Sequence, residues 1–175
     1  PHHGFWQTNQ VMTGLMVDMV LKAAGPLKGA SVLDLYCGAG LFSIPAAMAG
    51  ARVLGMELNE GSTIQAAENA LLNGSASSCT FQAGDAGALI AAQRPGQWDT
   101  VILDPPRAGA GPLVMAALAR MAPRRMVYVS CEPRGLVRDL KALGTAGWDI
   151  ARIQPLDMFP HTHHVETVVS LVRKA

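Results

Sequence analysis

The feature of this sequence that most constrains its fold is a regular alternation of short apolar runs with longer helical stretches. The short runs are rich in β-branched residues and are expected to form strands at 31–35, 52–57, 79–84, 99–104 and 125–130. Helical patterning occupies the stretches near 42–50, 61–73, 85–93, 111–122 and 134–146. Such alternation predicts an α/β fold in which a mostly parallel sheet carries helices on both faces.

The last part of the chain predicts a change of strand direction. Two apolar runs, 149–159 and 165–173, are separated by the short segment 160–164. Parallel neighbours need a crossover of about a dozen residues or more, so these two strands are expected to be antiparallel. We therefore expect a doubly wound, mostly parallel, seven-stranded sheet with an antiparallel last strand. Class I methyltransferases share that plan with other doubly wound folds, so the loops must decide between them.

The composition suggests one domain with an unusually apolar surface. Half of the 175 residues are apolar and 15% are charged, compared with about 25% charged in a typical soluble domain. The helix expected at 11–21 is apolar on more than one face. It is covered either by another domain or subunit or by its own sheet, and the sequence favours neither. The chain starts without Met, so we expect a fragment or a processed piece. No apolar run reaches the roughly 18 residues that span a bilayer.

Charge and cysteine content exclude several classes of protein. The net charge is +1, from 14 basic and 13 acidic residues, which by itself is not the footprint of a nucleic-acid binder. The three cysteines, Cys37, Cys79 and Cys131, are odd in number and widely spaced. That pattern fits a reducing cytoplasm and lacks the paired spacing of a zinc site. The histidines at 161, 163 and 164 have no third ligand type nearby in sequence, so we expect no metal.

The stretch "VLDLYCGAGLF" (32–42) predicts a cofactor-binding turn between a strand and a helix. Gly38 and Gly40 allow the backbone to approach a ligand closely. The third glycine of the dinucleotide fingerprint is replaced by Ser43, which argues against a bound pyrophosphate. Glu57 ends the next strand and could accept hydrogen bonds from both hydroxyls of a ribose. These features favour a nucleoside without phosphates, and S-adenosylmethionine (SAM) is the obvious candidate.

Two further strand ends carry acidic residues. Asp85 could reach an adenine amino group, or it could cap the helix that follows it. Asp104 is followed by two prolines that stiffen the loop. Enzymes that methylate base amino groups usually have an aromatic residue after these prolines, where this chain has Arg107. An exocyclic nitrogen is therefore a less favoured target.

Cys131 lies between a buried strand and the helix that starts near Pro133. Together "FWQTN" (5–9), "DLYCGAGLF", "DPPR" (104–107), "SCEP" (130–133), "RDL" (138–140) and "FPHTHHVE" (159–166) resemble the RNA 5-methyluridine methyltransferases. The resemblance covers nearly the whole chain in the family's order of motifs. It reaches only the family's C-terminal catalytic domain, so we expect residues 1–175 to form this domain without the family's N-terminal RNA-binding barrel and central domain.

The resemblance implies specific residue roles. It makes Cys131 the nucleophile and Glu166 the base. The positions that contact SAM in the family fall on Gln7, Tyr36, Glu57, Asp85 and Asp104. The implied substrate is a uridine of tRNA or rRNA, and we expect its binding to need the family's N-terminal domains. We expect the protein to be cytoplasmic. RNA 5-methylcytidine enzymes typically carry a second cysteine in the loop after Asp104, and its absence here favours uridine.

The chemistry requires these residue types independently. C5 of uracil is a poor nucleophile until a thiolate adds to C6, and a base must later remove the C5 proton. A free thiol has a pKa near 8.5, so Cys131 needs positive potential. Arg107, Arg134 and the helix N-terminus could supply it, and we expect Glu132 to face solvent. The alternatives are a SAM methyltransferase for another acceptor and a non-catalytic SAM-binding module.

Overall fold

The computed structural model of the protein describes residues 10–158 and 165–174. The strands in this part of the chain are β1 (Ser31–Leu35), β2 (Arg52–Glu57), β3 (Cys79–Ala83), β4 (Thr100–Leu103), β5 (Arg125–Ser130), β6 (Trp148–Leu156) and β7 (Glu166–Arg173). The helices are α1 (Gln10–Ala24), α2 (Ser43–Met48), α3 (Glu60–Leu72), α4 (Ala86–Ala91), α5 (Gly111–Met121) and α6 (Pro133–Thr145). Each lies within a few residues of its predicted range.

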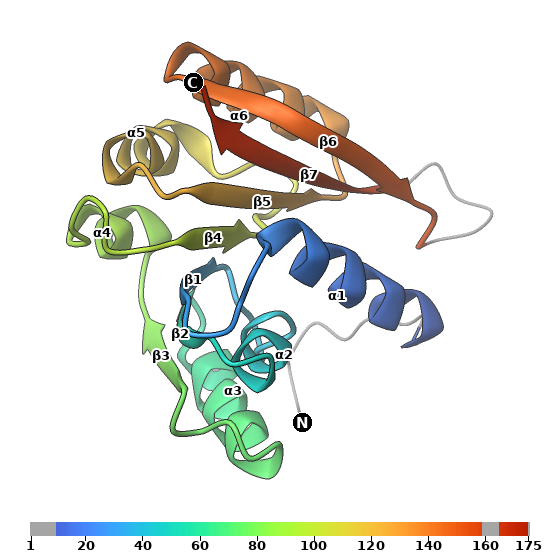
Figure 1. Cartoon of the computed structure of the whole chain (residues 1–175), viewed down its shortest axis with the longest axis vertical. Helices are drawn as coiled ribbons and strands as arrows, with labels where there is room; N and C mark the ends of the chain where they lie inside the picture. The colour runs from blue at the N-terminus through green and yellow to red at the C-terminus, as the bar shows by residue number, and fades with distance from the viewer. Residues whose placement is uncertain (1–9, 159–164, 175) are drawn as a thin grey trace.

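These strands form one sheet in the order β3-β2-β1-β4-β5-β7-β6 (Figure 1). Strands β1 to β5 are parallel to their neighbours, and β7 is antiparallel to both β5 and β6. The predicted doubly wound sheet with an antiparallel last strand is confirmed. The chain builds outward from β1 to β3 and then restarts at β4 on the other side of β1. In such sheets the crevice at the carboxyl ends of the two central strands is the usual ligand site.

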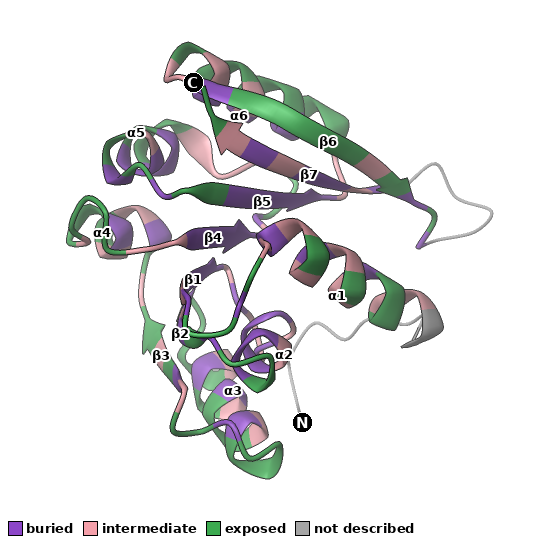
Figure 2. Cartoon of the chain, in the orientation of Figure 1, coloured by how far each residue is buried: buried purple, intermediate pink, exposed green. Residues whose placement is uncertain are grey.

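Side chains alternate across each strand, so the two faces of the sheet have separate cores. Val32, Ile102 and Val127 face the layer that contains α1, α2 and α3. Leu33 and Leu103 face the layer that contains α4, α5 and α6. Figure 2 shows β4 and β5 buried in the middle of the sheet and β6 largely exposed at its edge. The apolar residues of the runs 31–35 and 99–104 are consecutive rather than alternating because both faces of these strands are covered.

Helix α1 packs on its own sheet. It contacts β4, β5 and β7, and Met16, Val20 and Ala24 on its inner side are buried. Leu15 on the opposite side is 47% exposed. In the described part of the chain the helix is thus covered on one side, by its own sheet. Packing on its own sheet is one of the two interpretations that the sequence left open. No described helix is both long enough and apolar enough to span a membrane.

Candidate active site

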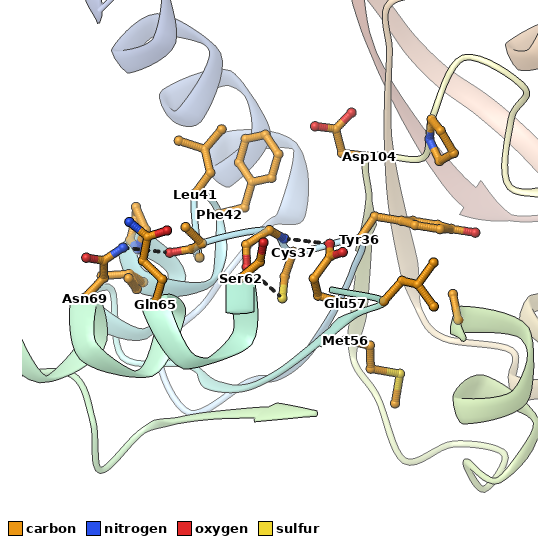
Figure 3. A pocket seen from close by; sticks show the side chains of 18 of the residues that line it. Tyr36, Cys37, Leu41, Phe42, Met56, Glu57, Ser62, Gln65, Asn69 and Asp104 are labelled. Atoms are coloured by element: carbon orange, nitrogen blue, oxygen red, sulfur yellow. Dashed lines mark hydrogen bonds between the residues drawn. The ribbon is translucent and has the colours of Figure 1, made fainter. Parts of the chain in front are cut away.

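A cavity of about 1160 Å³ opens at the carboxyl ends of β1, β2 and β4. The predicted cofactor-binding residues line it from several loops (Figure 3): Tyr36, Gly38, Gly40, Glu57, Asp85 and Asp104. The structure therefore brings together residues that lie up to 68 positions apart in sequence, from 36 to 104. Gln7, the remaining predicted contact, lies outside the described residues.

The turn after β1 has an unusual backbone. Tyr36, Gly38 and Gly40 have φ angles of +62°, +53° and +93°, a region that residues with a Cβ rarely adopt. A Cβ on Gly40 would also lie 2.9 Å from Cδ1 of Ile44 in α2, whereas one on Gly38 would meet nothing within 4 Å. Glycine is therefore favoured at position 38 by conformation alone, and at position 40 by conformation and by the approach of Ile44.

Glu57 holds this turn and still faces the cavity. Its Oε2 accepts a hydrogen bond from the backbone N–H of Gly38 at 3.1 Å (Figure 3). Its Oε1 accepts one from the backbone N–H of Asn59 at 2.9 Å. A carboxylate oxygen can accept two hydrogen bonds, so each oxygen keeps an acceptor position. The amide of Asn69 supports the other side of the turn by donating to the carbonyl of Ala39 at 3.1 Å. The resulting cradle presents a fixed anionic acceptor, which suits a vicinal diol.

Asp85 is the N-cap of α4. Its Oδ1 accepts a hydrogen bond from the N–H of Ala88 at 2.9 Å, and the same residue lines the cavity. The capping role that the sequence offered as an alternative is thus confirmed. Contact with an adenine stays a prediction that this position allows.

The buried carboxyl group of Asp34 lies beneath the turn and was not predicted from the sequence. Asp34 in β1 has 0% exposure, and its Oδ2 accepts a hydrogen bond from the hydroxyl of Ser43 at 2.5 Å. Within the described residues Oδ1 has no hydrogen-bond partner. Burial raises the pKa of Asp34 to about 7, although the bond from Ser43 lowers it. An acid inside the apolar run "VLDL" was the available signal. Ser43, at the place of the third glycine of the dinucleotide fingerprint, donates its hydroxyl hydrogen bond to this acid.

Strand pairing brings Cys131 and Glu166 together. In the antiparallel β5–β7 pair, Ser130 lies opposite Thr167, so the same register places the next residue, Cys131, beside Glu166. Directly opposite residues of an antiparallel pair have Cβ atoms about 4.5–5.5 Å apart. Asp104 follows β4 on the same face of the sheet. Glu166 and Asp104 both act electrostatically on the Cys131 thiol, which confirms that the three groups cluster.

Cys131 is half-buried and is therefore not sealed in the core. Burial raises the pKa of its thiol, and the neighbouring Glu166 and Asp104 raise it further. A hydrogen bond from the Arg107 side chain, and the charge of that guanidinium, lower the thiol pKa. Arg107 thus provides part of the predicted positive potential. Glu132 instead caps α6, since its Oε1 accepts a hydrogen bond from the N–H of Arg134 at 3.1 Å.

The two carboxyl groups beside Cys131 are held largely out of water. Glu166 is 7% exposed, its Oε2 lacks a hydrogen-bond partner among the described residues, and burial raises its pKa. Burial raises the pKa of Asp104 to about 8, with contributions from the charges of Glu166 and Asp34. A carboxylate with a raised pKa accepts protons more readily, which suits a general base.

The other two cysteines are buried, and burial raises the pKa of both thiols. Cys37 and Cys79 therefore pack as small apolar residues, in contrast to the half-buried Cys131. Within residues 10–158 and 165–174 no cluster of three potential ligand side chains could hold a metal ion. The histidines at 161, 163 and 164 lie outside these ranges.

Comparison with known proteins connects this site to one family. The sequence model of the tRNA (uracil-5-)-methyltransferases matches residues 1–78 and 94–174. An uncharacterized RNA methyltransferase of Thermotoga maritima is 42% identical over 173 residues, which are 99% of this chain and 39% of that protein. The 23S rRNA (uracil(1939)-C(5))-methyltransferase RlmD of Shewanella sp. (strain ANA-3) is 41% identical over 94% of this chain and 36% of its own length.

Among solved structures, the chain is similar to a tRNA (uracil-54, C5)-methyltransferase of Pyrococcus abyssi in complex with S-adenosyl-L-homocysteine. The TM-score is 0.86 with 37% sequence identity, over 97% of this chain and 40% of that one. The present chain therefore spans about two fifths of the length of the relatives that it matches. The matched part includes the strand ends that border the cavity.

Proposed function

Because the chain belongs to the tRNA (uracil-5-)-methyltransferase family, we propose that it transfers a methyl group from SAM to C5 of a uridine in tRNA or rRNA. The observation that carries this proposal is the half-buried Cys131 thiol, clustered with Glu166 and Asp104 next to the cavity of the glycine turn. A nucleophile, a base and a nucleoside cradle are the groups that methylation of C5 requires.

The acceptor groups that line the cavity support SAM as its ligand. Glu57 would accept from the ribose hydroxyls, Asp85 would lie toward the adenine, and Asp104 would lie toward the methionine part. Gly38 and Gly40 leave room beside the turn where side chains would intrude. When bound, SAM supplies an electrophilic methyl group on a positively charged sulfur.

Cys131 begins the reaction by adding to the uracil ring. Its thiolate forms a bond to C6, the C5–C6 pair shifts to form a C4–C5 double bond, and the C4–O4 π pair moves onto O4 as an enolate. As the C4–O4 double bond re-forms, the C4–C5 pair bonds C5 to the methyl carbon. The bond from that carbon to the sulfonium sulfur would break at the same time, and its electron pair would stay on the sulfur of the departing S-adenosyl-L-homocysteine. The ring then carries the methyl group and a proton on C5 and remains bonded to the sulfur of Cys131.

Glu166 completes the reaction by removing the C5 proton. The C–H electrons re-form the C5–C6 double bond, the bond between C6 and sulfur breaks, and the thiolate of Cys131 is regenerated. Arg107 stabilises this thiolate both at the start and at the end, because its side chain lowers the pKa of the thiol.

The substrate assignment rests on the family and on the loop after β4. A uridine must leave its base stack to reach a half-buried thiol. We propose that domains outside these 175 residues grip the RNA, since the relatives are more than twice as long as the matched part. This chain alone would then bind SAM and methylate RNA weakly or not at all. We also place the protein in the cytoplasm, where free thiols stay reduced.

A trapping experiment tests the covalent mechanism. RNA that contains 5-fluorouridine keeps a fluorine on C5 that Glu166 cannot remove, so wild-type full-length protein with SAM should form an adduct that survives denaturing electrophoresis. Cys131→Ala should form none, and Cys79→Ala should form as much as wild type. With ordinary uridine RNA, Glu166→Gln should accumulate a methylated adduct, because proton removal is slowed by about 10²–10⁴-fold.

The outcome also separates the two alternatives. An enzyme for another acceptor would keep its methylation activity in Cys131→Ala. A non-catalytic SAM-binding module would give neither adduct nor methylation in any variant. Adduct formation by Cys131→Ala would contradict the proposal directly.

A further inference from the structure

The loop that follows β4 is fixed by α6. This strand-four loop, residues 104–110, carries both Asp104 and Arg107. Asp139 in α6 is 2% exposed, and its Oδ2 accepts a hydrogen bond from the N–H of Ala110 at 2.7 Å. The neighbouring Arg138 donates from Nη2 to the carbonyl of Ala108 at 2.5 Å. Two consecutive residues of one helix thus hold the far end of the loop.

The loop backbone also packs directly on the first turns of α6. A Cβ on Gly135 would lie 2.9 Å from the carbonyl oxygen of Arg107 and 3.0 Å from the nitrogen of Gly109. A Cβ on Gly109 would lie 2.6 Å from Oδ2 of Asp139, and Gly109 has a φ of +81°. No side chain fits between these two segments, so the position of α6 determines the position of the loop.

The Asp139 carboxylate connects this contact to the strand that precedes Cys131. Its Oδ2 also accepts a hydrogen bond from the hydroxyl of Tyr128 in β5 at 2.8 Å. Its Oδ1 accepts from Nε and Nη2 of Arg138 at 3.2 and 3.1 Å. Tyr128 lies three residues before Cys131, and α6 begins two residues after it. One buried carboxylate therefore joins both sides of the Cys131 segment to the strand-four loop.

We propose that Asp139 is a positioning residue, which fixes the strand-four loop, and with it Arg107, against the segment that carries Cys131. It does not touch the substrate, since it is buried and all its hydrogen-bond donors come from the protein. The inference rests on the proposed function in one respect: a stabilised thiolate affects catalysis only if Cys131 adds to the uracil ring.

The direction in which the thiol pKa of Cys131 changes distinguishes a positioning role of Asp139 from the direct effect of its charge. The charged groups that face the thiol are Glu166 from β7 and Asp104 and Arg107 from the strand-four loop. Removing a negative charge at 139 would by itself lower the thiol pKa. Releasing Arg107 from the thiol would raise it, because a stabilising cation is lost. The two effects therefore oppose each other, and the proposal requires the second to prevail.

The rate of alkylation of Cys131 by iodoacetamide as a function of pH tests the proposal without RNA or SAM. Mass spectrometry of the Cys131 peptide separates this thiol from Cys37 and Cys79. Asp139→Asn should raise the apparent thiol pKa by about one unit and slow alkylation near neutral pH about tenfold. Arg107→Gln should give a similar shift. The double variant should shift no further, since both changes remove the same interaction.

Arg138→Gln provides a second test that does not remove a buried group. Its side chain is 60% exposed, so the fold should persist while the bonds to Ala108 and Asp139 are lost, and the thiol pKa should rise. Asp149→Asn, a matched change on the exposed strand β6, should leave the alkylation profile unchanged. Melting temperature and SAM affinity report whether each variant is folded.

An unchanged or lowered thiol pKa in folded Asp139→Asn and Arg138→Gln would overturn the positioning role. Additive shifts in the double variant would do so as well. These results are independent of the proposed function, which fails instead if Cys131→Ala still methylates RNA.

Discussion

Glu57 is the single side chain whose replacement most directly tests the cofactor cradle. In Glu57→Gln the amide has one acceptor oxygen in place of two, so the N–H of Gly38 or of Asn59 loses its partner, and a charged acceptor for the ribose is lost. Hydrogen bonds to charged groups contribute about 1.5–3 kcal/mol. We expect SAM affinity measured by calorimetry to fall roughly 10- to 150-fold.

The matched control for this change is Glu60→Gln, an exposed position in the first turn of α3. It should bind SAM as wild type does. Equal affinity in the wild type and Glu57→Gln would show that the carboxylate serves only the turn.

Individual residues were predictable from sequence where their type and their place in an element coincide. Gly38, Glu57, Asp85 and Asp104 stand at strand ends, and parallel strands bring those ends to one edge of the sheet. Asp139 was not predictable as a positioning group. The motif "RDL" (138–140) includes Asp139, but its role depends on Tyr128 and Ala110, which lie 11 and 29 positions away, and the motif does not indicate those contacts.

At the scale of elements, α6 contains two glycines with opposite roles. Gly135 faces the backbone of the strand-four loop, whereas a Cβ on Gly144 would meet nothing within 4 Å. Gly135→Ala should destabilise the protein by about 1–3 kcal/mol, because the loop backbone must move. Gly144→Ala should stabilise it by about 0.5–1 kcal/mol, because alanine restricts the unfolded chain and favours the helix.

Denaturant unfolding of both variants checks this pair of predictions. If Gly135 acts through the loop, Gly135→Ala should also slow alkylation of Cys131, and Gly144→Ala should not. Equal stabilities in the two variants would contradict the close packing of α6 on the loop.

Element boundaries agreed with the sequence because caps and breakers mark them. Asn59 caps α3 and Asp85 caps α4 through side-chain oxygens, and Pro133 occupies the first turn of α6. The face on which α1 packs could not be read from its own residues. Its apolar residues extend around the helix, so only the position of the sheet decides which of them are buried.

At the scale of the whole molecule, the buried carboxyl groups make stability depend on pH. The pKa of Asp34 is raised to about 7 by burial, so the folded state binds this proton more tightly than the unfolded state. The stabilisation is complete below the ordinary Asp pKa and is lost as the pH rises through about 7. Each unit of that range changes the free energy of unfolding by up to about 1.4 kcal/mol.

Asp34→Asn removes this dependence, so its stability relative to wild type should rise between about pH 5 and pH 8. Hydrogen bonds from Ser31 lower the pKa of Asp99. Asp99→Asn is therefore a control with the opposite pH dependence: the stability that it loses relative to wild type should become smaller in acid. Denaturant unfolding from about pH 3 to pH 8 provides the measurement, because the effect of Asp99 lies below the ordinary Asp pKa and that of Asp34 lies above it. Parallel curves for the wild type and Asp34→Asn would contradict a buried, protonated Asp34.

The order of strands in the sheet was only partly accessible from sequence. Alternation implies parallel neighbours and the short 160–164 segment implies an antiparallel pair, but neither says that β7 inserts between β5 and β6. That placement depends on contacts between distant segments. It also determines the pairing that brings Glu166 to Cys131.

The reversed direction of β7 has a consequence for biosynthesis. Glu166 is the first residue of its strand, and it reaches the carboxyl edge of the sheet only because β7 runs against its neighbours. A ribosome that has finished β6 has produced the thiol and the glycine turn, but β6 still lacks its strand partner and Glu166, the proposed base, has not been made. Emergence of β7 closes the gap in the hydrogen-bonded ladder and delivers Glu166 in one event, so formation of the proposed site is coupled to completion of this sheet.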